Sequence, residues 1–145
     1  MKSEINSPLR QAKWISYPYK FFDVSKGMPA PYLRKLFWLD KKVRKASLRI
    51  CGLGYYELYV NGRKAGDEVL NPPFTRYDVS VLYSTYDITG MLSLGENVVG
   101  VILGNGMYNM FAKNVWDFEK APWRHHPKLL LEMQIIFEDG KKKLI

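Results

Sequence analysis

Short segments that alternate between apolar and polar residues recur along most of the chain, and helical periodicity is nearly absent. An alternation of period two places successive side chains on opposite faces of an extended strand. Residues that favour turns separate these segments, as is typical of antiparallel β proteins. The pattern predicts six strands, which are Tyr32 to Leu39, Leu48 to Cys51, Tyr55 to Val60, Leu82 to Tyr86, Val98 to Leu103 and Leu129 to Phe137.

The stretch "GYYELYVNG", residues 54–62, shows how the faces are assigned. Tyr56, Leu58 and Val60 share one side of the predicted strand and have the composition of a core face. The other side carries Tyr55, Glu57 and Tyr59. We therefore predict that this stretch is scaffold and not a binding site, although it is rich in tyrosine.

The predicted connections are short and have recognisable chemistry. Asn61-Gly62 supplies the positive φ angles of a type I′ hairpin turn. Gly95–Asn97 is predicted to turn into a central strand, and Asp139-Gly140 to open a last hairpin. Asp87-Ile88-Thr89 is predicted to start a single helical turn. The fold class that fits is all-β, as one antiparallel β-sandwich or jelly roll.

The last hairpin has barely begun its return strand over residues 141–145, so we expect a fragment of a longer protein, truncated at the C-terminus. We divide the chain into a lead-in segment, residues 1–30, and an incomplete β-sandwich accessory domain, residues 31–145.

Composition and charge narrow the function classes. The chain has 145 residues, 47% hydrophobic and 25% charged, which suits one globular domain with a core. The net charge is +8, but the basic residues fall in turns and form no helical stripe, so we expect no nucleic-acid partner. No apolar run is long enough to span a membrane, and residues 1–10 do not form a signal peptide. The location of the protein stays open. Cys51 is the single cysteine, so we expect a buried hydrophobe and no intrachain disulfide.

One connection is abnormally long. Residues 104–127, "GNGMYNMFAKNVWDFEKAPWRHHP", show no strand or helix pattern. Such loops are usually functional or disordered, and the frequent aromatic residues argue against disorder. Asp117 and Glu119 could form a carboxylate pair, and His125-His126 could bind a metal. Such a carboxylate spacing arises often by chance, and loop solvation or ion pairing explains it more simply. Neighbouring histidines rarely serve one metal together and the sequence suggests no third ligand nearby, so we expect no metal site.

The aromatic residues are the better signal. Sugars stack their C–H patches on aromatic rings, while polar groups fix their orientation. The long loop offers Tyr108, Trp116 and Trp123 beside Asn105, and the loop "NPPFTRY", residues 71–77, adds Phe74 and Tyr77. These six residues are the candidate carbohydrate-binding residues. The alternative is that their rings pack over the sandwich or against a neighbouring domain.

The order of several motifs resembles the N-terminal β-sandwich of bacterial α-L-rhamnosidases. The matching stretches are, in order, "AKWISYP" at residues 12–18, Arg34 to Phe37, Gly54 to Gly62, Pro72 to Tyr77, Tyr86 to Thr89, Gly95 to Asn97 and Gly104 to Tyr108. Single motifs are weak, because similar turns occur in the sugar-binding domains of β-galactosidase-like enzymes. Two positions depart from the pattern, since Met107 and Phe74 stand where the family usually has tryptophan.

The resemblance implies a galactose-binding-like jelly roll within an inverting hydrolase that removes terminal L-rhamnose. The catalytic acids of that family lie in a separate (α/α)6 barrel, so the resemblance assigns no catalytic residue to this chain. It implies a non-catalytic accessory domain that helps substrate recognition or packs on the barrel of the same polypeptide. An autonomous carbohydrate-binding module and a purely structural scaffold remain alternatives. Cofactors are not expected, with calcium suggested by family analogy alone.

Overall fold

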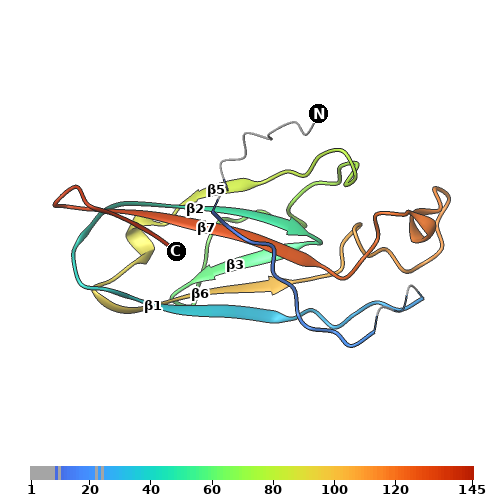
Figure 1. Cartoon of the computed structure of the whole chain (residues 1–145), viewed down its shortest axis with the longest axis horizontal. Helices are drawn as coiled ribbons and strands as arrows, with labels where there is room; N and C mark the ends of the chain where they lie inside the picture. Colours follow the sequence, from blue (N-terminus) through green and yellow to red (C-terminus); the bar gives the residue numbers. More distant parts are fainter. Residues whose placement is uncertain (1–8, 10, 22, 24) are drawn as a thin grey trace.

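A computed structural model describes residues 9, 11–21, 23 and 25–145. Two four-stranded antiparallel sheets face each other, and long loops extend from one end of the sandwich (Figure 1). The strands are β1 (Tyr32–Leu39), β2 (Val43–Leu53), β3 (Tyr56–Val60), β4 (Arg63–Lys64), β5 (Ser84–Asp87), β6 (Gly95–Leu103), β7 (Lys128–Phe137) and β8 (Lys142–Leu144). Two single 3-10 turns, η1 (Thr89–Met91) and η2 (Phe118–Lys120), complete the elements.

The strand order is β1-β6-β3-β4 in one sheet and β5-β2-β7-β8 in the other. The predicted all-β antiparallel sandwich is confirmed. The segment that is apolar on both faces forms most of β6, which lies between β1 and β3 as expected for a central strand. None of the helices among the described residues has the length and apolar character needed to cross a membrane.

The core lies between the sheets and follows the predicted alternation. Leu48 and Ile50 of β2 are fully buried, as are Met133 and Ile135 of β7, while the residues between them face outward. Leu58 of β3, in the other sheet, belongs to the same core cluster. Each such side chain contributes roughly 1.5–3 kcal/mol by leaving water, so the two sheets are held together mainly by this layer.

The hairpin turn after β3 has the predicted geometry. Asn61 and Gly62 have φ angles of 50° and 77°. The Asn61 side chain also ties the turn to the neighbouring strand, because its Oδ1 accepts a hydrogen bond from the Val98 N–H at 2.8 Å. Its Nδ2 donates to Asn97 Oδ1, also at 2.8 Å. The two-residue β4 that follows was too short to be predicted.

Several strand boundaries differ from the sequence prediction. β2 begins at Val43, so Arg44 and Lys45, which were expected in a turn, lie in the strand with exposed side chains. A register shift between Val43 and Lys45 accounts for the obscured alternation there. β6 already begins at Gly95, within the predicted turn. β5 begins at Ser84, because Leu82 and Tyr83 are half exposed and pair with no strand in the described part of the chain.

The single helical turn is present as η1. Asp87 Oδ1 accepts hydrogen bonds from the Thr89 N–H at 2.9 Å and from its hydroxyl at 2.6 Å. The last hairpin also forms, with Gly140 at a φ of 81° and the short β8 returning along β7.

The lead-in segment contacts the sandwich and the long loop. Ile15 exchanges two backbone hydrogen bonds with Leu129, each 2.8 Å long, so the chain runs beside the first residues of β7. The described residues do not include residues 1–8, 10, 22 and 24. The expectation that residues 1–10 form no signal peptide therefore falls almost entirely outside the described part of the chain.

Candidate functional site

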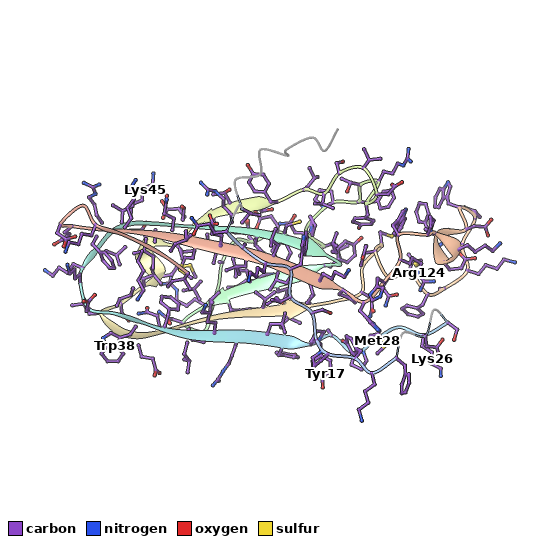
Figure 2. The ribbon with its side chains drawn as sticks, in the orientation of Figure 1. Tyr17, Lys26, Met28, Trp38, Lys45 and Arg124 are labelled. Carbon is purple, nitrogen blue, oxygen red and sulfur yellow. The ribbon has the colours of Figure 1, made fainter. Side chains whose placement is uncertain are left out.

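Three segments converge at one end of the sandwich: the lead-in, the loop of residues 71–77 and the long loop of residues 104–127. Met28 and Arg124 lie at this loop end, whereas Trp38 lies at the opposite end of the molecule (Figure 2). The arrangement follows from topology, because β3, β6 and β7 all begin or end here.

An aromatic cluster joins the two loops. Five of the six residues singled out from the sequence belong to it, namely Phe74, Tyr77, Tyr108, Trp116 and Trp123, together with Phe118. The Tyr77 ring lies 4.9 Å from Trp123 and 5.2 Å from Tyr108, in edge-to-face contact with both. Such pairs add about 0.5–1.5 kcal/mol each beyond their buried area. The cluster therefore stabilises the loop end as well as forming its surface.

The cluster has an inner and an outer part. Tyr108 is 5% exposed, and Tyr77 and Trp123 are half-buried beside it. Burial raises the pKa of Tyr77 to about 12, with smaller contributions from Tyr55, Cys51 and Tyr108. Trp116, in contrast, is 72% exposed and Phe74 is 44% exposed. These two rings are therefore the most exposed part of the cluster.

The outer rings are stacked. Phe118 lies 5.1 Å from Phe74 with an interplanar angle of 27°, and 5.9 Å from Trp116 with an angle of 22°. Phe118 was not among the candidate residues. Its position depends on contacts between two loops distant in sequence, and the linear pattern of the long loop carries no sign of it.

The backbone around Trp116 is held by its own side chains. Asn114 Oδ1 accepts hydrogen bonds from the Trp116 N–H at 2.9 Å and the Phe118 N–H at 3.4 Å. Asp117 adopts a left-handed conformation with a φ of 53°, and its carboxylate pairs with Lys120 at 2.9 Å. The Asp117 carboxylate, considered above as half of a carboxylate pair with Glu119, is thus engaged by a lysine.

Asn105 forms hydrogen bonds with the lead-in and with the long loop itself. Its Nδ2 donates to the Met28 carbonyl at 2.6 Å, and its Oδ1 accepts from the Met28 N–H at 3.1 Å. The Asn109 amide also donates to this Oδ1, at 2.7 Å. In this structure Asn105 therefore fastens the lead-in to the long loop.

A buried arginine extends this polar chain, and sequence reasoning missed it. Arg124 is 6% exposed and donates to Asn109 Oδ1 at 3.2 Å and to the Glu119 carbonyl. Burial lowers the pKa of its guanidinium, and the Glu119 charge opposes this shift. An arginine within an aromatic loop gives no signal in sequence that it turns inward.

The histidine pair also belongs to the packing of this end. The His126 ring stacks on Tyr19 of the lead-in at 4.5 Å, and His125 meets His126 edge to face at 5.1 Å. Within the described part of the chain, no three histidine, cysteine, aspartate or glutamate side chains gather as a metal site would require.

A polar network supports the base of the 71–77 loop. The Asn71 side-chain amide donates to Tyr56 Oη at 2.8 Å and to Tyr86 Oη at 3.0 Å. Burial raises the pKa of Tyr56, so this hydroxyl stays protonated. Tyr56, on the inward face of the "GYYELYVNG" stretch, therefore supports the base of this loop.

Comparison with known proteins places the chain in a family. The profile of the "Alpha-L-rhamnosidase N-terminal domain" matches residues 41–145. An α-L-rhamnosidase of Formosa agariphila is 41% identical over 116 residues, which are 79% of this chain and 12% of that protein.

Solved structures agree. The α-L-rhamnosidase of Aspergillus terreus superposes with a TM-score of 0.84 at 29% identity, over 96% of this chain and 16% of that one. The Streptomyces avermitilis enzyme, solved in complex with L-rhamnose, superposes with a TM-score of 0.73 at 36% identity, over 81% of this chain and 11% of that one. The chain thus spans only a small part of the length of these relatives. It belongs to the α-L-rhamnosidase N-terminal domain family.

Proposed function

We propose that this chain is the non-catalytic accessory domain of an α-L-rhamnosidase and that its loop end helps to recognise rhamnose-bearing glycans. The observation that carries the recognition role is the row of stacked rings Phe74, Phe118 and Trp116, whose two outer members are solvent-exposed.

The outer rings suit a sugar ligand. The exposed indole of Trp116 offers an apolar surface on which the C–H face of a deoxy sugar can stack, as in aromatic-lined ligand sites. Asp117 and Lys120 follow Trp116 closely in sequence, and their side chains are 55% and 70% exposed. Both can form hydrogen bonds with sugar hydroxyls.

The site is also preorganised. The Asn114 side chain holds the backbone on both sides of Asp117, and Phe118 is stacked between the other two rings. A loop held in this way pays less ordering entropy when a ligand binds.

Calorimetric titration of the chain with L-rhamnose and with a rhamnose-containing oligosaccharide tests this proposal. We expect saturable heat that is lost in Trp116→Ala and retained in Trp38→Ala. The second variant is a matched control, because Trp38 is 63% exposed and lies at the far end of the sandwich. A flat titration with the unmodified chain would remove the recognition role.

The accessory role makes a separate prediction. We expect this chain alone to leave an aryl α-L-rhamnoside intact, while the full-length protein hydrolyses it. Hydrolysis by the chain alone would show that the domain is itself catalytic.

A purely structural role between domains is the second candidate, and one observation favours it. The outward side chains of β1 include Tyr32, Leu36 and Trp38, which are 80%, 50% and 63% exposed. Exposed apolar residues gathered on one strand can mark an interaction surface. If this face packs on another domain, Trp38→Arg should loosen the full-length protein, detected as faster proteolysis between domains, and should leave sugar binding by the isolated chain unchanged.

A further inference from the structure

Basic side chains gather at the end of the sandwich opposite the loop end. Residues 40–45 carry four basic side chains and one acidic, and residues 138–143 carry three basic and two acidic. The two segments lie side by side, because the Glu138 N–H donates to the Lys42 carbonyl at 3.1 Å. Together they have a net charge of +4, which is half of the net charge of the chain. Lys45 marks this end in Figure 2, far from Arg124 at the loop end.

A β-bulge directs two of these cations to the same side of the sheet. The register against β7 shifts between Val43 and Lys45, which makes Arg44 an extra residue in β2. Such a bulge re-aims side chains along the strand that carries it. Val43 packs on the core and Ala46 is fully buried, so the two residues between them both face outward and are exposed. Arg44 and Lys45 therefore place two neighbouring positive charges on the outer face.

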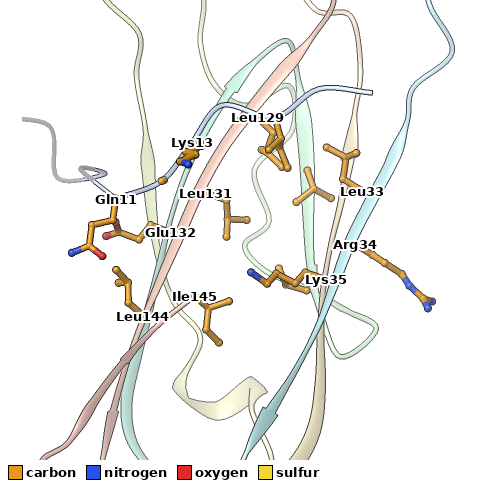
Figure 3. A pocket seen from close by; sticks show the side chains of 14 residues that line it. Gln11, Lys13, Leu33, Arg34, Lys35, Leu129, Leu131, Glu132, Leu144 and Ile145 are labelled. Atoms are coloured by element: carbon orange, nitrogen blue, oxygen red, sulfur yellow. The ribbon is translucent and has the colours of Figure 1, made fainter. Parts of the chain in front are cut away.

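A third cation joins them from β8. Lys45 and Lys142 both pair with Ile136, from opposite sides of β7. Leu144 and Ile145 point to opposite sides of β8 (Figure 3), and Ile145 packs on the core. Lys142 precedes Leu144 by two residues and so shares its outward side. Two strand spacings, about 9–10 Å, separate the backbones that carry the two lysines.

The group formed by Arg44, Lys45 and Lys142 is called the basic patch. Among the described residues, none of these three cations takes part in an ion pair. Asp87 borders the patch on the β5 side, where its carboxylate accepts two hydrogen bonds from Thr89. The charges of the patch are thus available to an anionic ligand.

The surroundings of the patch suit a sugar chain. Ile136 lies between the two lysines and offers an apolar contact for the C–H groups of a sugar ring. The next row of the outer face carries Gln134 and Ser47, which are partly exposed and pair with each other across the two strands. Their side chains can exchange hydrogen bonds with sugar hydroxyls.

We propose that the basic patch binds acidic polysaccharides, which carry carboxylate or sulfate groups along the chain. An extended polymer with repeated anionic groups can reach cations on both sides of Ile136 at once. The patch and its neighbours hold no aromatic ring on which nucleic-acid bases could stack, which favours a sugar polymer over a single-stranded nucleic acid. The patch is separate from the loop end, so this proposal does not rest on sugar recognition through Trp116.

Calorimetric titration of the unmodified chain at low salt with polygalacturonate, dextran sulfate and neutral dextran tests the proposal. Polygalacturonate contains no rhamnose, so its binding is independent of a rhamnose site. We expect saturable binding of an acidic polymer that weakens as salt screens the charges, and no binding of dextran. The stronger acidic ligand identifies the preferred anionic group. Binding of neither acidic polymer, equal binding of dextran, or tighter binding of a single-stranded oligonucleotide would overturn the proposal.

Two triple variants with the same loss of charge locate the binding. Replacing the three cations of the patch should weaken binding about tenfold, because exposed charge pairs each contribute little. This variant combines Arg44→Gln, Lys45→Gln and Lys142→Gln. The control combines Arg34→Gln, Lys20→Gln and Lys113→Gln, all at exposed positions outside the patch. Arg34 points away from the space between the sheets (Figure 3). We expect the control to bind nearly as well as the unmodified chain, and equal weakening of both variants would contradict a localised patch.

A second measurement needs no variant of the patch. Backbone amide signals of the unmodified chain, followed during titration with an oligogalacturonate, should shift at residues 44–47 and 134–136. Trp116→Ala should leave these shifts unchanged, so loss of rhamnose binding and loss of polysaccharide binding are separate results. Shifts confined to the loop end would place the acidic ligand elsewhere and overturn the assignment.

Discussion

The indole of Trp123 lies 4.9 Å from the ring of Tyr77, in edge-to-face contact across two loops that the sequence separates widely. This contact joins the long loop to the 71–77 loop and forms the inner part of the aromatic cluster. The two tryptophans of the cluster therefore have different roles. Trp123 is half-buried and packs against other rings, whereas Trp116 is exposed to solvent.

The first prediction concerns this division of roles. Trp123→Ala should lower the free energy of unfolding by about 3 kcal/mol, because it removes a large ring from a packed cluster. Trp116→Ala should change it by less than about 0.5 kcal/mol, as expected for an exposed side chain. Denaturant unfolding of both variants checks this. Equal losses would mean that the cluster is not divided into packing and surface parts.

Much of the fold could be predicted because its signals are local. Alternation placed Tyr56, Leu58 and Val60 on the core face, and Asn61-Gly62 determined the hairpin. The start of β2 could not be predicted, because Arg44 and Lys45 occupy exposed strand positions where charge is tolerated.

The candidate site was predicted only in part. Aromatic frequency identified the two loops, and their contacts bring five of the six candidate residues together. Which rings turn inward depends on packing between segments that are distant in sequence. For the same reason, the local sequence did not predict that Arg124 turns inward or that Asn105 bonds to Met28.

The second prediction concerns that attachment. Asn105→Ala removes three hydrogen bonds and leaves the backbone groups of Met28 without this partner, which should cost about 2 kcal/mol of stability. Limited trypsin digestion should then cleave faster after Lys20 and Lys26, while cleavage after Lys141 at the far hairpin serves as the control. Unchanged cleavage of the lead-in would show that Asn105 does not hold it.

The third prediction isolates backbone strain at the hairpin. Gly62 has a φ of 77° and open space around it, so Gly62→Ala adds strain without a clash and should cost about 1–2 kcal/mol. Gly90 has equally open space but no positive φ. Gly90→Ala should therefore be neutral within about 0.5 kcal/mol, measured as the shift in denaturation midpoint at constant slope. A similar loss in both variants would argue against the turn geometry.

The fourth prediction is a pH dependence. Burial is the largest cause that lowers the pKa of His126 below 6.5, and His125 adds to it, while a hydrogen bond with the Phe21 backbone opposes the shift. As the pH falls, His126 is therefore protonated more readily in the unfolded chain than in the folded protein. This contribution to stability is present above pH 6.5 and is lost as the pH falls through the lowered value. Denaturation midpoints measured from pH 7.5 to 5 should fall.

Substitution of each histidine shows which one causes the loss of stability at low pH. His126→Gln should flatten this fall, and His125→Gln should reduce it less, because His125 is more exposed. A fall of unchanged size in the double variant would trace the effect to other groups.

If the loop end recognises the sugar, Trp116 should contact it, and the indole N–H signals of the four tryptophans report on such contact. A ¹H–¹⁵N spectrum recorded during titration with a rhamnose-containing oligosaccharide reports on Trp14, Trp38, Trp116 and Trp123 separately. We predict a saturable shift of the Trp116 signal, a smaller one for Trp123 and none for Trp38. Four unmoved signals, or a shift confined to Trp38, would rule out recognition of the sugar through Trp116.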